Sequence, residues 1–290
     1  MNDIEQRAAA AVKGKFRREL WGPFITALKE YELLKEGDRV AVCLSGGKDS
    51  ALLAVLMKEL RRVSDYPFDV EYIAMDPGYT AENRARMEEN ARALGIPLRV
   101  FETNVLRVAG RQEKSPCYLC ARMRRGYLYS FAKELACNKI ALGHHMTDVI
   151  VTTVMGMLWG SQISGMLPRL KSTNFEGMEL IRPLFRIRED DIVRWARSTG
   201  LEFLGCACSV ASDEGRLSSK RQQTKELIAE LKKTNPDVEI NLFNSLKNVE
   251  LDTFVGYKTE GEYHSFLERL EGGGVSTPDK RMQAETGKTE

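Results

Sequence analysis

Apolar positions follow two alternating patterns between residues 37 and 200. Short continuous apolar runs predict buried strands, whereas apolar residues at every third or fourth position predict helices. The predicted strands cover residues 40–44, 70–75, 97–101, 139–142 and 180–184. The predicted helices cover about 49–63, 81–94, 121–136, 147–158 and 189–198. This alternation predicts an α/β fold with a parallel sheet of about five strands and helices on both faces.

The regions outside this alternation have different patterns. Residues 1–36 form a predicted N-terminal helical segment, and 37–210 form the central α/β domain. Residues 211–270 are polar with helical spacing, which predicts a C-terminal helical extension. The last stretch, 271–290, contains three consecutive glycines and few apolar residues, so we expect it to be disordered. Within the domain, the glycine-containing stretch 160–174 is predicted to be a loop.

Composition adds three expectations. Hydrophobic residues make up 43% and charged residues 29% of the 290 residues, as in an ordinary soluble globular protein. No stretch approaches the ~18 apolar residues of a membrane span, and the first residues lack a signal-peptide pattern, so we expect no membrane partner and a cytoplasmic protein. A net charge of +2 does not demand a nucleic-acid partner, so any RNA site depends on local basic clusters. Such clusters lie at 13–18, 122–125 and 220–221, and each could equally be a solvated helix face.

The most informative stretch is residues 45–50, Ser-Gly-Gly-Lys-Asp-Ser, which lies between the first predicted strand and its helix. Two glycines allow a sharp turn and a close backbone approach, and Asp49 or Ser50 could cap the helix. A strand, a glycine turn and a helix N-terminus in that order form an anion site. The stretch is not a Walker A loop, because Val42 stands where that motif needs glycine. The alternative is a glycine-rich turn that binds nothing.

Residues 45–50 resemble, position by position, the signature of the PP-loop ATP pyrophosphatases. The resemblance implies a Rossmann-like PP-loop fold, the adenine nucleotide alpha hydrolase-like fold, in which this loop cradles the phosphates of ATP. Members of that family adenylate a carbonyl oxygen and release pyrophosphate.

Four of the six cysteines have spacing that suggests metal or sulfur chemistry. Cys117 and Cys120 form a C-x-x-C pair before a predicted helix, and Cys206 and Cys208 form a C-x-C pair beyond the last strand–helix unit. Three interpretations remain open: a four-cysteine zinc site, an iron–sulfur cluster held by three cysteines, and reduced cysteines without metal. Cys43 and Cys137 lie in apolar segments and are expected in the core.

Longer motifs resemble the TtcA family, the tRNA-cytidine(32) 2-sulfurtransferases, over about residues 15–250. They are Pro-Cys-Tyr-Leu-Cys-Ala-Arg-Met-Arg-Arg-Gly at 116–126, Lys-Ile-Ala-Leu-Gly-His-His at 139–145, Ile-Arg-Pro-Leu at 181–184, and 241–249. The resemblance implies a [4Fe-4S] cluster held by Cys117, Cys120 and Cys206 within a PP-loop catalytic domain. The family commonly has C-x-x-C where this chain has C-x-C, so Cys208 remains the alternative third ligand.

The resemblance also assigns roles within the site. Lys48 would neutralise charge on pyrophosphate, and Asp49 and Asp148 would position Mg²⁺. Arg124 would steady the oxyanion, bind tRNA phosphate or pair with an acid. The adenine would rest near Cys43 and Ile73, at the ends of the first two strands. Thr147 replaces the first of two adjacent family acids, and we expect no catalytic role for the two histidines before it. The residues assigned to the nucleotide are Cys43, Ser45, Gly46, Gly47, Lys48, Asp49, Ser50, Ile73, Gly143 and Asp148.

The function implied is ATP- and Mg²⁺-dependent thiolation of cytidine 32 in the tRNA anticodon loop, giving 2-thiocytidine. The implied partners are tRNA, an upstream sulfur donor (a cysteine desulfurase or sulfide) and a second copy of the chain in a homodimer. One alternative is a sulfur transferase acting on another tRNA base or a small molecule. Another is a zinc-stabilised nucleotide- or RNA-binding protein without sulfur chemistry.

Overall fold

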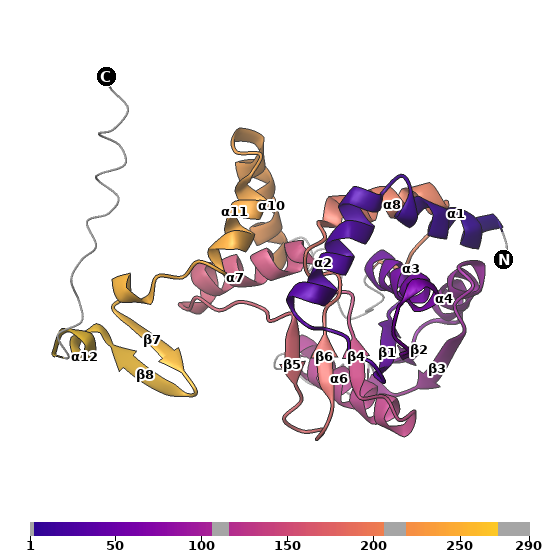
Figure 1. Cartoon of the computed structure of the whole chain (residues 1–290), viewed down its shortest axis with the longest axis horizontal. Coiled ribbons are helices and arrows are strands. Elements are labelled where there is room, and N and C mark those ends of the chain that lie inside the picture. Colours follow the sequence, from indigo (N-terminus) through magenta and orange to yellow (C-terminus); the bar gives the residue numbers. More distant parts are fainter. Residues whose placement is uncertain (1–2, 106–115, 206–218, 272–290) are drawn as a thin grey trace. The chain divides into compact units, whose positions relative to one another are not determined.

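The computed structural model describes residues 3–105, 116–205 and 219–271. Its main feature is a six-stranded sheet with the order β3-β2-β1-β4-β6-β5 (Figure 1). Neighbouring strands are parallel except β5, which pairs antiparallel with β6. The predicted α/β class with a largely parallel sheet is confirmed. The strands are β1 (Arg39–Leu44), β2 (Asp69–Asp76), β3 (Leu98–Glu102), β4 (Lys139–Ala141), β5 (Arg169–Lys171) and β6 (Glu179–Ile181).

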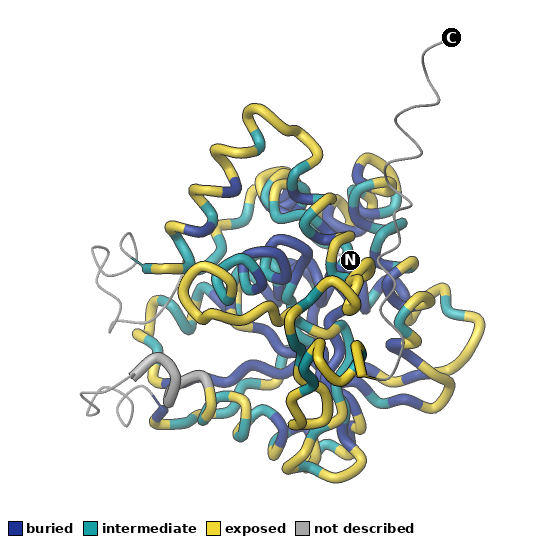
Figure 2. Tube along the Cα trace, turned by 90° about the vertical axis from the view of Figure 1, so that its left-hand side faces the viewer, coloured by how far each residue is buried: buried dark blue, intermediate teal, exposed yellow. Residues whose placement is uncertain are grey.

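Helices cover both faces of this sheet, as the apolar strands predicted. One face carries the helices α1, α2, α3, α4 and α8 in one continuous core, and the other carries α6 (Figure 1). Figure 2 shows buried residues gathered toward the centre, with exposed residues around them. The helices of the first unit are α1 (Asp3–Lys13), the π-helical turn η1 (Arg17–Trp21), α2 (Gly22–Glu30), α3 (Lys48–Val63), α4 (Ala81–Ala93), α6 (Pro116–Glu134), α7 (Met146–Gly160), α8 (Glu189–Thr199) and α10 (Lys220–Thr234).

Strand β1 shows why the apolar run is continuous. Val40, Val42 and Leu44 belong to the core on the α3 face, whereas Ala41 and Cys43 belong to the core under α6. Successive side chains of a strand point to opposite faces, so a strand buried on both sides needs an apolar residue at every position.

The chain divides into two compact units, Met1–Glu239 and Ile240–Glu290. The first unit therefore extends past the predicted boundary at residue 210, because α10 packs against α7. The second unit contains most of α11 (Val238–Ser245), the 3₁₀ turn η2 (Leu251–Thr253) and α12 (Phe266–Glu271). It also contains a hairpin formed by β7 (Gly256–Thr259) and β8 (Glu262–Ser265). The predicted disordered tail falls almost entirely outside the described residues.

Two predictions about local structure were wrong. The stretch 160–174 is not wholly a loop, because it contains β5, a three-residue edge strand too short to show periodicity. The hairpin lies in a segment predicted to be helical. Its turn residues Glu260 and Gly261 both have positive φ, which is the geometry of a tight two-residue hairpin turn.

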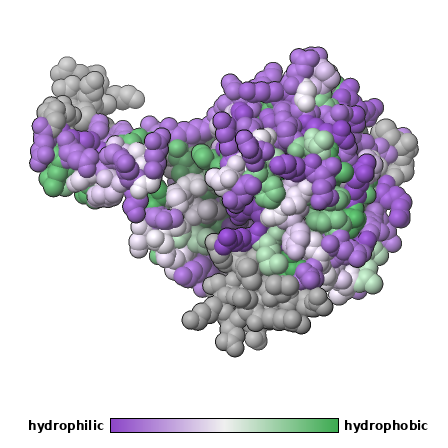
Figure 3. Space-filling model, turned by 90° about the horizontal axis from the view of Figure 1, so that it is seen from below, coloured by the Kyte–Doolittle hydropathy of each residue, from purple (hydrophilic) through white to green (hydrophobic). Residues whose placement is uncertain are grey.

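No helix within the described residues is long and apolar enough to cross a membrane. The face seen in Figure 3 is mostly hydrophilic, with small separate hydrophobic areas.

A buried ion pair ties the start of β4 to the chain before β1. The ammonium of Lys139 is 2.7 Å from a carboxylate oxygen of Asp38 and donates to the carbonyl of Leu33 at 2.9 Å. Both charged side chains are more than 90% buried. Removing one partner of such a pair leaves the other charge uncompensated.

We therefore expect Lys139→Met to lower the free energy of unfolding by about 3–5 kcal/mol, measured by urea denaturation. The control is Lys233→Met, which removes an ion pair with Glu230 whose side chains are about 70% exposed and should change stability by less than about 1 kcal/mol. Equal effects of the two substitutions would contradict the importance of the buried pair.

Candidate functional site

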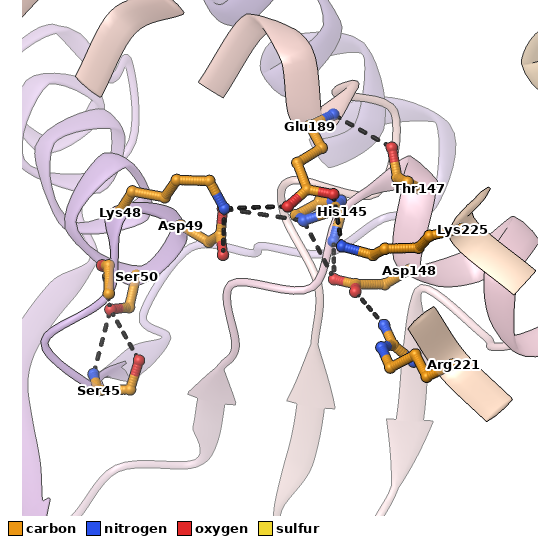
Figure 4. Close-up of polar contacts among 11 residues, drawn as sticks. Ser45, Lys48, Asp49, Ser50, His145, Thr147, Asp148, Glu189, Arg221 and Lys225 are labelled. Carbon is orange, nitrogen blue, oxygen red and sulfur yellow. Dashed lines mark hydrogen bonds and ion pairs between the residues drawn. The ribbon is translucent and has the colours of Figure 1, made fainter. Parts of the chain in front are cut away.

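The loop after β1 holds its shape by its own hydrogen bonds. Gly46 has φ of +80°, which glycine adopts without strain. The Ser50 hydroxyl accepts from the backbone N–H of Ser45 at 3.1 Å and donates to the carbonyl of Gly47 at 2.9 Å (Figure 4). The N-cap residue of α3 is Gly47, which has no side chain, so the helix has no side-chain capping hydrogen bond. The expectation that Asp49 or Ser50 caps the helix was wrong, and the uncapped first turn leaves backbone N–H groups for an anion.

Strand β4 ends directly against this helix. A Cβ added to Gly143 would lie 3.0 Å from the backbone N of Ser50 and 3.1 Å from the carbonyl carbon of Asp49. Because these contacts are to backbone atoms, no rotamer change relieves them. Glycine at 143 thus allows the carboxyl end of β4 and the first turn of α3 to approach closely.

The segment after α8 is anchored on the same loop. The backbone N–H of Leu204 donates to the carbonyl of Gly46 at 3.0 Å. A Cβ on Gly46 would come within 2.5 Å of the Leu204 side chain. The chain therefore enters the segment carrying Cys206 and Cys208 from a point in contact with the glycine loop. Those two cysteines lie outside the described residues.

Lys48 and Glu189 form the centre of a charged network between α3, α8 and α10. The Lys48 ammonium is 3.0 Å from Asp49 and 3.1 Å from Glu189, and Lys225 is 2.7 Å from the other oxygen of Glu189 (Figure 4). Burial lowers the pKa of Lys48, but the two carboxylates outweigh it and raise that pKa overall. Burial raises the pKa of Glu189, but Lys225 and Lys48 reverse this and bring it to about 2. Both groups are therefore charged at neutral pH.

A second set of contacts surrounds Asp148 at the start of α7. One of its carboxylate oxygens accepts from the backbone N–H of His145 at 3.1 Å and is 3.4 Å from Nε2 of the same residue. The other oxygen pairs with Arg221. His145 also lies 3.8 Å from Asp49, so one buried imidazole is close to both carboxylates. Burial raises the pKa of Asp148, but His145 and Arg221 outweigh it and lower that pKa.

These carboxylates fit the Mg²⁺ that the resemblance implies. Oδ1 of Asp49 is buried and accepts no hydrogen bond, and its near neighbours are the Lys48 ammonium at 3.0 Å and the His145 imidazole at 3.8 Å. Mg²⁺ in nucleotide sites is commonly held by one or two carboxylates together with the phosphates and water. Within 3–105, 116–205 and 219–271, no group of three or more His, Cys, Asp or Glu residues forms a metal site.

Thr147, which replaces a family acid, has a structural partner. Its hydroxyl accepts from the backbone N–H of Glu189 at 3.2 Å and so fixes the first residue of α8. A cavity of about 410 Å³ adjoins this contact. Its lining residues are Thr147, Val151, Glu189, Asp190, Lys225, Ile228, Ala229, Lys232, Lys233 and Glu239.

Cys43 and Ile73, predicted near the adenine, are paired across β1 and β2. Both side chains are buried under α6, and burial raises the pKa of the Cys43 thiol to about 12. In this structure they belong to the core, so only the backbone at the strand ends could face an adenine ring. Their contact with the nucleotide stays a prediction.

Helix α6 places the first cysteine pair. It ends at Glu134, shortly before β4 begins, and its 19 residues span about 28 Å. Its first turns, which contain Cys117 and Cys120, therefore lie toward the edge where the parallel strands end. Arg124 follows one turn later and is partly exposed. The side chains of Cys117 and Cys120 are not among those described.

Sequence reasoning missed Glu189, Lys225 and the proximity of His145 to both carboxylates. Glu189 opens α8 in the acidic run Glu189-Asp190-Asp191, a pattern typical of helix N-termini in general. Lys225 follows no motif. Only the packing of α8 and α10 around α3 and α7 makes these side chains part of the site.

Comparison with known proteins decides the family. A family described as a PP-loop domain matches residues 23–208. The tRNA-cytidine(32) 2-sulfurtransferase of Geotalea uraniireducens is 34% identical over 251 residues, which are 85% of this chain and 94% of that protein. The chain belongs to this family of PP-loop proteins. The resemblance found in the sequence is confirmed.

Other proteins similar to this PP-loop protein support the same family. The protein of the same name from Geobacter sulfurreducens is 34% identical over 227 residues, covering 77% of this chain and 87% of its own length. A solved structure, the U34-tRNA thiolase NcsA from Methanococcus maripaludis with its [4Fe-4S] cluster, has a TM-score of 0.64 at 20% identity. It covers 90% of each chain. At that identity, the likeness shows a shared fold.

The contact at Gly143 gives a first prediction for the site. Gly143→Ala should displace the first turn of α3, lower the free energy of unfolding by about 1–3 kcal/mol and weaken ATP binding. Urea denaturation and isothermal titration calorimetry with ATP measure the two effects. Gly126→Ala in α6, where an added Cβ meets nothing within 4 Å, should leave stability unchanged or slightly higher. Unchanged stability and ATP affinity in Gly143→Ala would show that the close contact is unimportant.

His144 gives a prediction about pH. Burial, together with Arg182, His145 and Arg221, outweighs Asp148 and lowers the pKa of His144 from 6.5 to about 4. Between these values the unfolded chain binds more protons than the folded protein, so stability falls as the pH falls. The stabilisation is complete above pH 6.5 and decreases by up to about 3 kcal/mol toward pH 4. Urea denaturation across this range should show a smaller pH dependence for His144→Asn, and an identical dependence would contradict the assignment.

Proposed function

We propose that this chain is an ATP-dependent tRNA sulfurtransferase that replaces the C2 oxygen of cytidine 32 with sulfur. The observation that carries the proposal is the 34% identity to a tRNA-cytidine(32) 2-sulfurtransferase across 94% of that protein. The local geometry supports it, because the glycine loop, the two carboxylates and the entrance to the late cysteine pair adjoin one another.

The loop supplies the groups that ATP chemistry needs. The C2 oxygen of cytosine is a poor leaving group until it carries an adenylyl group. Backbone N–H groups around Gly46 and Gly47 and the Ser50 hydroxyl would bind the phosphates, and Lys48 would neutralise charge on the departing pyrophosphate. Asp49 and Asp148 would hold Mg²⁺ against the same phosphates.

Three cysteines would hold the [4Fe-4S] cluster: Cys117, Cys120 and Cys206. Thiolates at the start of α6 are favoured by the helix N-terminus. The anchor of Leu204 on Gly46 supports a third ligand from the following segment, which starts beside the nucleotide loop. When bound, the cluster would deliver sulfur from the upstream donor to C2, and the activated oxygen would leave with AMP. Arg124 would steady the charge on that oxygen or contact tRNA phosphate.

The RNA must present an unpaired base to this edge of the sheet, and an anticodon-loop nucleotide meets that need. The 122–125 cluster on α6 is our main candidate for contacts to the tRNA phosphates, because Arg122 and Arg125 are exposed on the helix that carries the first cysteine pair. In the 13–18 cluster, Lys13 is already paired with Glu59 at 2.5 Å.

Two further partners belong to the proposal. A cysteine desulfurase or free sulfide would donate the sulfur. A second copy of the chain would form a homodimer, which is supported by exposed apolar side chains at the end of α7 and in the loop after it. These side chains are Met157, Leu158, Trp159, Ile163 and Leu167.

The test is mass spectrometry of nucleosides from bulk tRNA in a strain lacking this protein. We expect 2-thiocytidine to be absent, to return with the wild-type protein and to stay absent with Cys117→Ala or Lys48→Ala. Cys137→Ala is the matched control, because Cys137 is a buried core cysteine and should restore the modification. The purified wild-type protein should contain iron and sulfide.

Different outcomes separate the alternatives. Unchanged 2-thiocytidine in the deletion strain would refute the substrate, and loss of another thionucleoside would identify a different one. Colourless protein containing zinc would refute the cluster. Cys206→Ala should lose iron and Cys208→Ala should keep it, and the reverse result would identify Cys208 as the third ligand.

A further inference from the structure

Without α10, the carboxylates beside the glycine loop outnumber the Lys and Arg side chains that pair with them in the described part of the chain. There, helices α3, α7 and α8 bring Asp49, Asp148 and Glu189 together with the Lys48 ammonium, and the His145 imidazole lies between the two aspartates. Carboxylates are ordinarily ionised at neutral pH. A magnesium-bound triphosphate is itself an anion. These three helices alone would therefore oppose the binding of ATP by like-charge repulsion.

Helix α10 supplies the missing positive charge. Arg221, Thr224, Lys225 and Ile228 follow the three- and four-residue spacing of one helix face, and Thr224 and Ile228 are buried. Arg221 pairs with Asp148, and Lys225 pairs with Glu189 at 2.7 Å. With α10 in place, three cations meet three carboxylates (Figure 4).

The geometry places these two cations beside the nucleotide loop. Glu189 contacts Lys48 through one carboxylate oxygen and Lys225 through the other, so both ammonium groups lie against one carboxylate. Arg221 is held on Asp148, which lies 3.4 Å from the imidazole that also approaches Asp49. The side chains of Arg221 and Lys225 remain 42% and 30% exposed. An ammonium has three N–H donors and a guanidinium has five, so each group can donate a hydrogen bond to a further partner.

We propose that Arg221 and Lys225 are phosphate-binding residues that complete the ATP site from α10. The proposal rests on the proposed function for the identity of the ligand. Lys225 would bind phosphate oxygens beside those bound by Lys48, and Arg221 would bind phosphate oxygens next to Asp148. Their carboxylate partners hold both side chains in place before the nucleotide arrives, which reduces the entropy lost on binding.

The alternative role is purely structural, with these ion pairs only fastening α10 to the domain. Lys232, on the same helix, provides the comparison. It is 2.8 Å from Asp190 and 2.6 Å from Glu239, and neither acid contacts Lys48 or Asp148 in the ion pairs of the described residues. Removing Lys232 loosens the same helix without removing charge from the glycine loop. Thermal unfolding monitors that loosening in every variant.

The experiment is isothermal titration calorimetry of the purified full chain with the non-hydrolysable analogue AMPCPP and with AMP, both in the presence of Mg²⁺. Arg221→Gln and Lys225→Gln should each weaken AMPCPP binding at least about tenfold, with a smaller effect on AMP, because charged hydrogen bonds to the outer phosphates are lost. Arg221→Lys should recover part of the affinity. Lys232→Gln and the exposed Lys233→Gln should bind AMPCPP like the wild type.

Each outcome has one meaning. If the wild-type chain binds no AMPCPP, the proposed function itself fails. If the wild type binds and both glutamine variants bind equally well, the phosphate role of Arg221 and Lys225 is refuted. Equal weakening by Lys232→Gln would also refute it, because the effect would then come from loosening α10.

Discussion

The close contact between the end of β4 and the first turn of α3 is the constraint on which the site depends. Gly143 leaves no room for a side chain between the two backbones. Asp148 follows the end of β4 by a few residues, and Asp49 lies in the first turn of α3. The contact between these two elements therefore sets the separation of the two carboxylates. Their shared neighbour His145 is 2% exposed and cannot move aside without disturbing the core.

Ion pairs around Glu189 also hold the helices of the site together. Glu189 links α3 to α10 through Lys48 and Lys225, and Thr147 holds the backbone of Glu189 in position. A charge buried in such a network is stable only while its partners stay. The same side chains thus organise the site and hold four helices together. Loss of one member is expected to disturb ligand binding and local packing together.

The described residues on either side of the segment 206–218 both contact the site. Before it, Leu204 donates a hydrogen bond to Gly46, and after it, Arg221 pairs with Asp148. Both anchors lie on the groups that we assign to the nucleotide.

Much of the fold and the glycine loop followed from the sequence alone. An apolar run such as 40–44 indicates that a strand is buried on both faces. The positive φ that Gly46 allows is a property of that residue alone. Both features can therefore be predicted without knowing any distant contact. The short strand β5 and the hairpin around Gly261 were missed because few residues carry their pattern. The Lys48–Glu189 pair joins residues 141 positions apart. A charged side chain looks the same in sequence whether it faces water or a distant partner, and only the packing of the helices decides which.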